Sequence, residues 1–347
     1  MTTGRVKLLI GSPLDAALVE QIRAVDPRLE VTFRPDLLGT PRYYADHHPP
    51  SDRDAAGEAE FRALLAETEV LFDFDTATAA DLPRLAPKLR WVQSTSAGVG
   101  QAIVRYGLDK TDIIVTTSSG IHAVPLAEFV LMVMLHFTKN YPLLAARKAE
   151  RRFERFATGQ LPGKTLAIVG PGKIGREIAR LARPFGVRTV ALGRTVRAPE
   201  ALGVDVVHVY TRPELHTMLG EADFLVLIAP HTPETEDMID AAAITALKPG
   251  AVLVNIARGQ LIDEDALLAA LRSGQIAGAA LDVFRDEPLP PTSPFWDEPN
   301  VIINAHSAST SDGEDERIVD IFCHNLGHYL AGHPERMRNI LDKALMY

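Results

Sequence analysis

The sequence predicts an α/β fold with two doubly wound parallel sheets, and three observations support this prediction. Short apolar runs alternate with helical patterns along most of the chain, as strands and helices do in such sheets. A glycine-rich turn at residues 170–175 follows one apolar run and opens a helical pattern. The chain has 347 residues, more than one ordinary hydrophobic core needs, so we expect two domains.

The first third of the chain contains the strands and helices of one sheet. We expect strands at residues 6–10, 30–33, 70–74, 89–93 and 113–116, with helices at 15–25 and 55–68. The segment 39–53 is rich in proline, histidine, tyrosine and aspartate, and we expect it to be a loop. This alternation indicates a parallel sheet with helices on both faces.

The rest of the chain supplies the second sheet. An apolar helix is expected from about 124 to 138, and the polar, basic segment 147–164 is expected to cross the surface. Asp263 and Gly274 have the residue types that begin and end a helix. We predict further helices at 176–185, 263–273 and 314–331, and strands at 166–169, 188–192, 224–228, 252–256, 278–281 and 301–304.

The glycine-rich turn has the spacing of a dinucleotide-binding motif, Gly170-Pro171-Gly172-Lys173-Ile174-Gly175. The first glycine of such a motif permits a tight turn, the second lets the backbone approach a pyrophosphate, and the third lets helix and strand pack closely. The diphosphate then faces the positive end of the helix dipole. Because two predicted strands flank the turn, we expect a nucleotide cofactor here rather than a glycine-rich turn of another α/β domain.

The end of the strand 188–192 bears on which cofactor binds. A site for NAD usually carries Asp or Glu there for the ribose 2′-hydroxyl, whereas this chain continues Gly193-Arg194-Thr195-Val196-Arg197. Arginine can hold a 2′-phosphate through two parallel hydrogen bonds. We therefore predict that Arg194, Thr195 and Arg197 bind NADP in preference to NAD. The alternative is that these arginines belong to an ordinary surface loop.

The composition makes several partners unexpected. The formal net charge of −9 disfavours nucleic acid and anionic membranes. The longest apolar stretch, 129–137, is too short to span a bilayer, and we expect no signal peptide before the first strand. Cys323 is the only cysteine, so neither a disulfide within the chain nor a cysteine metal cluster is expected. These features predict a cytoplasmic protein.

Several further motifs give the chain a resemblance to the D-isomer-specific 2-hydroxyacid dehydrogenases. Besides the glycine-rich turn, they occupy residues 93–99, 120–128, 229–235, 255–259, 281–284, 286–288 and 304–306. The resemblance implies a Rossmann cofactor domain at residues 119–308, inserted into a flavodoxin-like substrate domain formed by residues 1–118 and 309–347. It also implies a homodimer formed through the cofactor domain, with the apolar helix 126–137 supplying a buried stripe.

The resemblance assigns roles to three side chains. Arg258 matches the arginine that binds the carboxylate and carbonyl of a 2-oxoacid, a task that suits a fixed guanidinium. His306 matches the acid/base that protonates the carbonyl oxygen, and Glu287 matches its carboxylate partner, which favours the imidazolium form. Without this context, the three would be taken for a surface charge, a structural histidine and a solvated turn.

The remaining site residues are carried over in the same way. The backbone N–H groups expected to bind the substrate carboxylate lie in the loop Ala97, Gly98 and Val99. The cofactor is expected to contact Pro230, His231, Thr232, Ala257 and, near the nicotinamide, Asp282. No metal site is expected. The chain departs from the family pattern at Gly100, where many relatives have aspartate.

Together these residues predict an oxidoreductase that transfers hydride between NADP(H) and a 2-oxoacid/D-2-hydroxyacid pair, similar to the NADP-preferring hydroxypyruvate and glyoxylate reductases. One alternative is a dinucleotide-sensing, corepressor-like binding protein of the same fold, which usually carries a tail or docking extension not evident here. The other is a formate- or phosphite-type dehydrogenase. Formate enzymes have glutamine in place of Glu287. We expect N-terminal loops to set substrate specificity, including Tyr43, Tyr44 and residues 74–78.

Overall fold

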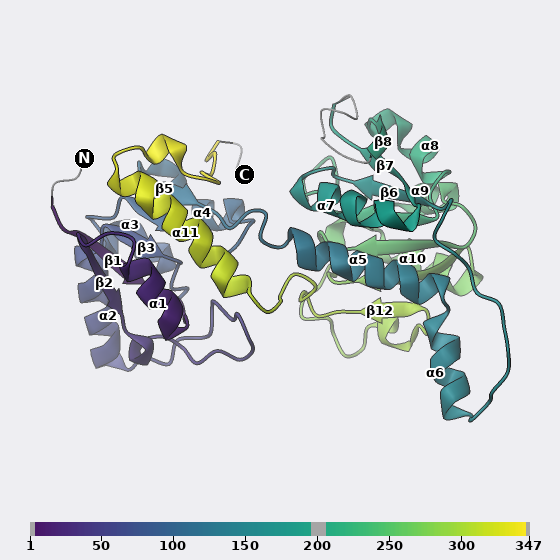
Figure 1. The fold of residues 1–347 in the computed structure, drawn as a ribbon, viewed down its shortest axis with the longest axis horizontal. Coiled ribbons are helices and arrows are strands. Elements are labelled where there is room, and N and C mark those ends of the chain that lie inside the picture. Colours follow the sequence, from purple (N-terminus) through teal and green to yellow (C-terminus); the bar gives the residue numbers. More distant parts are fainter. Residues whose placement is uncertain (1–3, 196–205, 345–347) are drawn as a thin grey trace. The chain divides into compact units, whose positions relative to one another are not determined.

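The computed structural model describes residues 4–195 and 206–344, and the chain forms two compact units (Figure 1). Unit 1 consists of Met1–Ile121 and Thr310–Tyr347, and unit 2 consists of His122–Ser309. The chain therefore completes unit 2 before its last helix returns to unit 1.

Unit 1 is built on a five-stranded sheet in which all strand pairs are parallel. Its strands are β1 (Val6–Ile10), β2 (Leu29–Phe33), β3 (Val70–Phe72), β4 (Trp91–Gln93) and β5 (Ile114–Thr116). They lie in the order β2-β1-β3-β4-β5, which is the flavodoxin-like order. The predicted doubly wound parallel sheet is confirmed.

Helices cover both faces of this sheet. They are α1 (Ala16–Arg23), α2 (Ala55–Glu67), α3 (Leu82–Leu85), α4 (Gly100–Arg105) and α11 (Glu314–Leu330). On the face covered by α1 and α11, the ring of Phe322 lies 5.0 Å from those of Phe72 and Trp91. On the opposite face, α2, α3 and α4 pack against Leu9 and Leu71. The side chains of β1 and β3 alternate between these two cores, as a strand buried on both faces requires.

Unit 2 contains a seven-stranded parallel sheet. Its strands are β6 (Thr165–Val169), β7 (Arg188–Leu192), β8 (Val206–Tyr210), β9 (Phe224–Leu227), β10 (Ala251–Asn255), β11 (Ile276–Leu281) and β12 (Val301–Ile303). The order is β12-β11-β10-β9-β6-β7-β8. Strand order reverses at β6, so the carboxyl ends of β6 and β9 border the switch point at which such sheets bind ligands.

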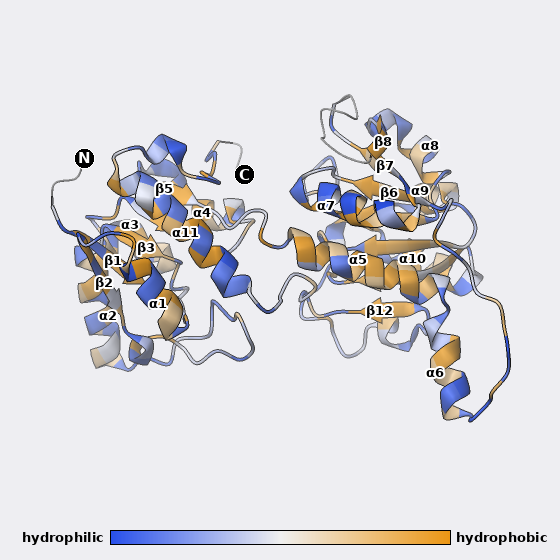
Figure 2. Cartoon of the chain, in the orientation of Figure 1, coloured by the Kyte–Doolittle hydropathy of each residue, from blue (hydrophilic) through white to orange (hydrophobic). Residues whose placement is uncertain are grey.

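The helices of unit 2, apart from α6, which has no buried residue, bury their apolar faces against this sheet (Figure 2). They are α5 (Ala123–Thr138), α6 (Tyr141–Ala149), α7 (Lys173–Ala182), α8 (Leu215–Leu219), α9 (Ala241–Ala246) and α10 (Glu264–Ser273). Helices α5 and α7 cover one face, and α8, α9 and α10 cover the other. Among the described residues, α5 and α6 have enough length and apolarity for a membrane span only as a pair bent by 62°, and no single helix has both.

Two expectations about helices need correction. The segment 147–164 was expected to cross the surface, and its residues 150–160 are exposed, but its first three residues belong to α6. This helix was not predicted; it is started by Asn140, whose side chain accepts a hydrogen bond from Leu143 N. Helix α7 begins at Lys173, within the glycine-rich turn itself, rather than at residue 176. It ends at Ala182, where Pro184 allows only a 3₁₀ turn to continue.

Candidate active site

The glycine-rich turn connects β6 to α7, and its three glycines meet different surroundings. Gly170 has a φ of +102°, and a Cβ there would lie 3.0 Å from the backbone nitrogen of Ala229. A Cβ on Gly175 would lie 2.7 Å from Gly170 O, so only glycine lets the helix approach the strand this closely. A Cβ on Gly172 would meet no atom within 4 Å. The turn therefore needs its first and third glycines for folding, whereas the second borders open space.

The first turn of α7 suits an anionic group. Gly172 caps the helix without a side-chain hydrogen bond, and the first turn has no acidic residue. Lys173 lies there instead, and its pKa is lowered by burial and by the charge of Arg176. Two cations at the positive end of a helix dipole repel one another unless an anion joins them. The open space at Gly172 and this charge together fit a dinucleotide diphosphate.

The strand end that was expected to select the cofactor carries Arg194 and Thr195, both exposed. Arg197 lies outside the described residues. A carboxylate from another loop adds to this region: the pKa of Glu234 is lowered by a hydrogen bond from Thr232, by its own backbone and by the charge of Arg194. The sequence motif could not have predicted this contact, because Glu234 lies 40 residues after Arg194.

The loop after β9 contains Pro230, His231 and Thr232. Thr235 organises it, since its hydroxyl donates to Pro230 O at 2.8 Å and accepts from Thr232 N at 2.8 Å. The ring of His231 lies at 3.4 Å from the carboxylate of Glu236. This loop lies at the carboxyl end of β9, next to that of β6, and therefore at the switch point of the sheet.

Arg258 follows β10 and is exposed. The buried side chain of Asn255 shapes the turn beneath it: Oδ1 accepts from Ala257 N at 3.1 Å, and Nδ2 donates to Arg258 O at 2.9 Å. The Arg258 guanidinium also donates to Ala257 O at 2.6 Å. Arg258 therefore stands on a backbone fixed from inside the sheet while its guanidinium remains exposed.

His306 and Glu287 are brought together at the carboxyl edge of the same sheet. His306 Nδ1 lies 2.8 Å from Glu287 Oε2, and Glu287 Oε1 accepts from Phe284 N at 2.9 Å. The side chain of His306 is 46% exposed and that of Glu287 is 36% exposed. Because Nδ1 is engaged by Glu287, Nε2 is the ring nitrogen left for another group.

Asp282 lies directly beneath His306 and is buried. Its Oδ1 accepts from Ser307 N at 2.8 Å, Ala308 N at 3.0 Å and Asn304 Nδ2 at 2.9 Å. Burial raises the pKa of Asp282, although the hydrogen bonds from Ala308 N and Ser307 N lower it. The sequence suggested only a cofactor contact for Asp282, whereas the structure shows a carboxylate that holds the turn carrying His306.

The predicted substrate loop lies in unit 1, after β4. Ala97 and Gly98 are exposed, and Val99 is buried at the start of α4. Thr95 anchors the loop to Asp73, donating from its hydroxyl to Oδ2 at 2.6 Å and from its backbone to Oδ1 at 3.2 Å. The other predicted site residues that the structure describes all belong to unit 2.

Comparisons with known proteins agree with this arrangement. Residues 131–308 match the family model described as the D-isomer specific 2-hydroxyacid dehydrogenase, NAD binding domain. A glyoxylate reductase of Korarchaeum cryptofilum is 33% identical over 255 residues, which cover 71% of this chain and 75% of that protein. A D-3-phosphoglycerate dehydrogenase of Methanocaldococcus jannaschii is 31% identical over 303 residues, 83% of this chain but only 56% of that protein. The chain thus spans about half the length of such relatives.

Solved structures resemble almost the whole chain. A D-isomer specific 2-hydroxyacid dehydrogenase family protein from Aeromonas salmonicida has a TM-score of 0.79 and 30% identity, covering 98% of this chain and 100% of that one. An NADPH-dependent glyoxylate/hydroxypyruvate reductase from Sinorhizobium meliloti, solved with NADP and sulfate, has a TM-score of 0.76 and 25% identity. It covers 99% of this chain and 100% of that one.

Proposed function

The chain belongs to the D-isomer-specific 2-hydroxyacid dehydrogenase family, and we propose that within it the chain is an NADP-dependent reductase of small 2-oxoacids such as glyoxylate and hydroxypyruvate. The observation that carries this proposal is the 2.8 Å contact between His306 and Glu287 in the unit that also holds the glycine-rich turn. It supplies an oriented proton donor beside a sheet suited to a dinucleotide.

The proposed reaction divides the work between cofactor and chain. When bound, the reduced nicotinamide supplies a hydride to the carbonyl carbon of the 2-oxoacid. His306 donates the proton from Nε2 to the carbonyl oxygen, becomes neutral, and regains a proton from solvent. Glu287 accepts a hydrogen bond from Nδ1 and so orients the ring. The products are the 2-hydroxyacid and the oxidised cofactor.

Arg258 is proposed to bind the substrate in this reaction. Its guanidinium can donate to the carboxylate and to the carbonyl oxygen at once, and it stabilises negative charge that develops on that oxygen. Backbone N–H groups of Ala97, Gly98 and Val99 are proposed to bind the same carboxylate. The turn fixed by Asn255 supports the first role, and the anchoring of the loop through Thr95 supports the second.

NADP is the proposed cofactor. Gly170, Gly172, Lys173, Ile174 and Gly175 would hold the diphosphate, and Arg194, with Thr195 and Arg197, would hold the 2′-phosphate. The relative from Sinorhizobium meliloti, which is described as NADPH-dependent, supports this choice. Pro230, His231, Thr232, Ala257 and Asp282 are proposed to lie along the rest of the cofactor.

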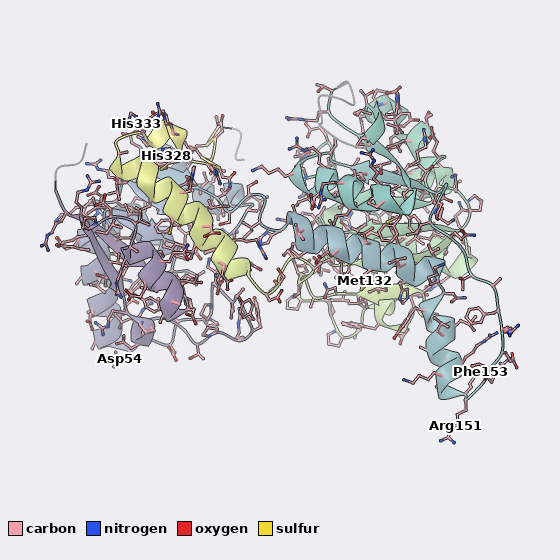
Figure 3. The ribbon with its side chains drawn as sticks, in the orientation of Figure 1. Asp54, Met132, Arg151, Phe153, His328 and His333 are labelled. Atoms are coloured by element: carbon pink, nitrogen blue, oxygen red, sulfur yellow. The ribbon has the colours of Figure 1, made fainter. Side chains whose placement is uncertain are left out.

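We also propose a homodimer formed through unit 2, but not through the whole apolar stripe of α5. Ala127, Val130 and Met134 are fully buried against the sheet and α7 of their own unit. Met132 of α5 stays exposed (Figure 3), and four further apolar side chains are exposed in the segment 141–156. They are Tyr141, Leu144, Phe153 and Phe156. A second copy of the chain would cover them. The absence of nucleic-acid and membrane partners and a cytoplasmic location remain predictions from the sequence.

A steady-state assay tests the proposed function. Wild-type protein is mixed with NADPH or NADH and with glyoxylate, hydroxypyruvate or pyruvate, and the loss of reduced cofactor is followed. We expect reduction of at least one 2-oxoacid, with NADPH the better cofactor and a D-hydroxyacid product on chiral analysis. Arg258→Ala should lose most activity. Arg272→Ala serves as the matched control, because it removes an exposed arginine of α10 that pairs with Glu298. Tight NADPH binding without turnover would favour the corepressor-like alternative.

A further inference from the structure

We propose that His48 selects the substituent on the third carbon of the substrate by donating a hydrogen bond to a hydroxyl group there. This inference rests on the proposed reductase function and names the side chain that decides which small 2-oxoacid is preferred. A 2-oxoacid with a 3-hydroxyl, such as hydroxypyruvate, would therefore be favoured over one with a bare methyl group, such as pyruvate.

His48 is oriented by a carboxylate in the same way as the proposed catalytic histidine. Its Nε2 lies 3.2 Å from Oδ2 of Asp73, which is fully buried at the end of β3 and has a φ of +65°. A buried carboxylate held in this strained conformation fixes the ring opposite it. Within the described part of the chain, this ion pair is the one side-chain bond that His48 makes, so its Nδ1 is left for a ligand.

Asp73 also connects His48 to the predicted substrate loop. The same Oδ2 that faces His48 accepts the hydroxyl of Thr95 at 2.6 Å, and Oδ1 accepts the backbone N–H of Thr95 at 3.2 Å. Thr95 begins the segment that leads to Ala97, Gly98 and Val99. The Asp73 carboxylate therefore joins His48 to the loop that is proposed to bind the substrate carboxylate.

A small hollow in unit 1 borders His48. Its walls come from the end of β1 (Gly11 and Pro13), from the loop carrying His47 and His48, and from the segment 74–76 after β3. Its free volume is about 10 Å³, which is close to the room that one water-sized group needs. A hydroxyl group fits this space, whereas a carboxylate or phosphate does not. Gly11 cannot be enlarged, because a Cβ there would lie 2.9 Å from Asp73 O.

The acidic groups around His48 favour its protonated, hydrogen-bond-donating form. Asp73, Asp46 and Asp75 all raise the pKa of His48, with Asp73 contributing most and burial opposing it. Asp46 is paired with Arg42 at 2.8 Å, and Asp75 is paired with Arg53 at 2.9 Å. Protonated His48 can therefore donate a hydrogen bond, while the carboxylates of Asp46 and Asp75 are already paired with arginines.

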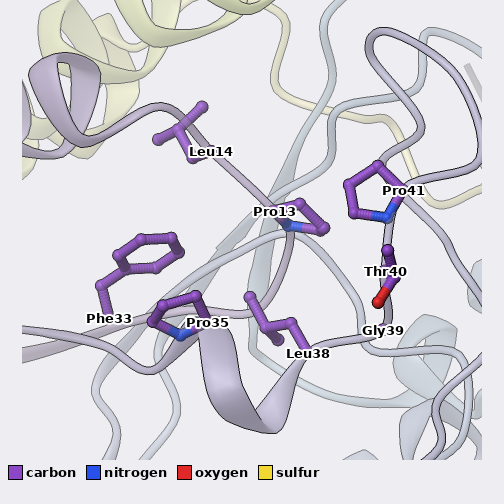
Figure 4. A pocket seen from close by; sticks show the side chains of 8 residues that line it. All are labelled: Pro13, Leu14, Phe33, Pro35, Leu38, Gly39, Thr40 and Pro41. Carbon is purple, nitrogen blue, oxygen red and sulfur yellow. The ribbon is translucent and has the colours of Figure 1, made fainter.

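A second hollow in unit 1 provides the contrast. It has a volume of about 190 Å³ and shares Pro13, Leu38 and Gly39 with the small one (Figure 4). Proline, leucine and phenylalanine side chains line it, with the Thr40 hydroxyl as its polar side-chain group. Its lining residues carry no charge, whereas His47, His48 and Asp75 line the small hollow.

The test compares hydroxypyruvate with pyruvate, because the two differ only in the 3-hydroxyl. We expect His48→Ala to lower the ratio of their kcat/KM values by about tenfold or more, since a site built to bind a hydroxyl loses its discrimination with the donor. His48→Gln keeps a donor and should retain part of the ratio. His333→Ala is the matched control, because His333 pairs with Glu335 on the surface after α11 (Figure 3). It should leave the ratio unchanged.

The pH dependence of the substrate ratio gives a second readout, which a purely structural role of His48 would not produce. The hydroxypyruvate-to-pyruvate ratio should fall as pH rises through the raised pKa of His48, because neutral Nδ1 can only accept from the hydroxyl and the stronger, charge-assisted bond is lost. Asp73→Asn should move that fall to lower pH, and His48→Gln should abolish it. An unchanged ratio in His48→Ala, with both substrates reduced by wild type, would overturn the inference while leaving the reductase function intact.

If wild type reduces no 2-oxoacid, the proposed function fails, and His48 is then judged by binding. Calorimetry with the NADP⁺-bound protein should show D-glycerate binding more tightly than D-lactate in wild type, and this difference should disappear in His48→Ala. Equal binding of the two hydroxyacids by wild type would contradict the inference on its own.

Discussion

Asp282 accepts hydrogen bonds from the turn that carries His306. Outside the proposed reacting groups, we therefore expect substitution of Asp282 to lower activity and stability most. Replacing Asp282 with Ala removes the acceptor of three hydrogen bonds and leaves the N–H groups of Ser307 and Ala308 without it. We expect the free energy of unfolding to fall by about 1–3 kcal/mol, together with a loss of kcat. Asp282→Asn keeps an acceptor and should lose less of both. Denaturant unfolding and steady-state kinetics measure the two effects. A stable, fully active Asp282→Ala protein would contradict this role.

Arg194 and Glu234 should act in opposite directions on cofactor choice. Charge-assisted hydrogen bonds are worth roughly 1.5–3 kcal/mol, so Arg194→Ala should lower kcat/KM for NADPH by about tenfold or more and change NADH much less. Glu234→Gln removes a carboxylate that interacts with Arg194 and would repel a 2′-phosphate. It should therefore raise the NADPH-to-NADH ratio. Equal losses with both cofactors in Arg194→Ala would show that the arginine is structural.

Residue identities in the sequence motifs are enough to propose Arg258, Glu287 and His306 as the reacting groups. They are not enough to find Asn255 or the His48–Asp73 pair. Asn255 acts through two hydrogen bonds to its own turn, which no motif encodes. His48 and Asp73 lie 25 residues apart, and only the packing of a loop against the end of β3 brings them together. Sequence spacing predicts partners within one helix or turn, but not partners joined by tertiary packing.

Among the structural elements, the loop 39–53 should respond most strongly to pH. The side chain of His47 is 9% exposed. Its Nε2 lies 3.6 Å from Glu314 Oε1 and 3.5 Å from Asp315 Oδ1, both on α11, and the charge of Asp73, just after β3, also acts on it. The pKa values of His47 and His48 are raised above 6.5, His47 by these carboxylates against its burial and His48 chiefly by Asp73. The stability they contribute is therefore complete below pH 6.5 and is lost as pH rises through the raised values.

Hydrogen exchange of the loop 39–53 measures this response. Protection, relative to the pH-corrected intrinsic rate, should decrease as pH rises above about 6.5 and through the raised pKa values. His47→Gln should flatten the decrease. At the acid end, burial of Asp73 is outweighed by the charge of His48 and by hydrogen bonds from His48 and Thr95, so its pKa is lowered. The contribution of Asp73 is therefore lost as pH falls through that lowered value. Protection that rises with pH across the histidine range in wild type would contradict this account.

Helices and strands with clear capping residues or apolar patterns in the sequence were predicted closely. Several short elements without such features were missed. Helix α10 begins where its cap was expected, since Asp263 accepts from Ala266 N, and it ends at Gly274 with a φ of +76°. Strand β7 has the predicted bounds. Strand β8 and helices α8 and α9 were missed, because five or six residues carry too little periodicity to be recognised. Their positions are set by packing against the sheet.

At the scale of the whole molecule, the exposed segment 141–156 should control assembly. Arg147 holds this segment in place: its guanidinium stacks 4.4 Å from the ring centre of Phe156 and donates to Glu154 O at 2.8 Å. Phe153 is nonetheless fully exposed. Phe153→Ser should weaken the dimer, measured by light scattering at micromolar concentration. Val207→Ser, at an exposed position on β8, should leave the dimer intact. A monomeric wild-type protein would contradict the dimer.

The central claim is that His306, held by Glu287, protonates the carbonyl during NADPH-dependent reduction. The most direct measurement is the kcat of His306→Ala beside wild type, with the best 2-oxoacid and with NADPH binding measured in parallel. We expect kcat to fall by about 10²- to 10⁴-fold, the usual contribution of general acid catalysis, while NADPH binding is retained. Near-normal turnover by His306→Ala would contradict the assignment of the acid and, with it, the roles proposed for Glu287 and Arg258.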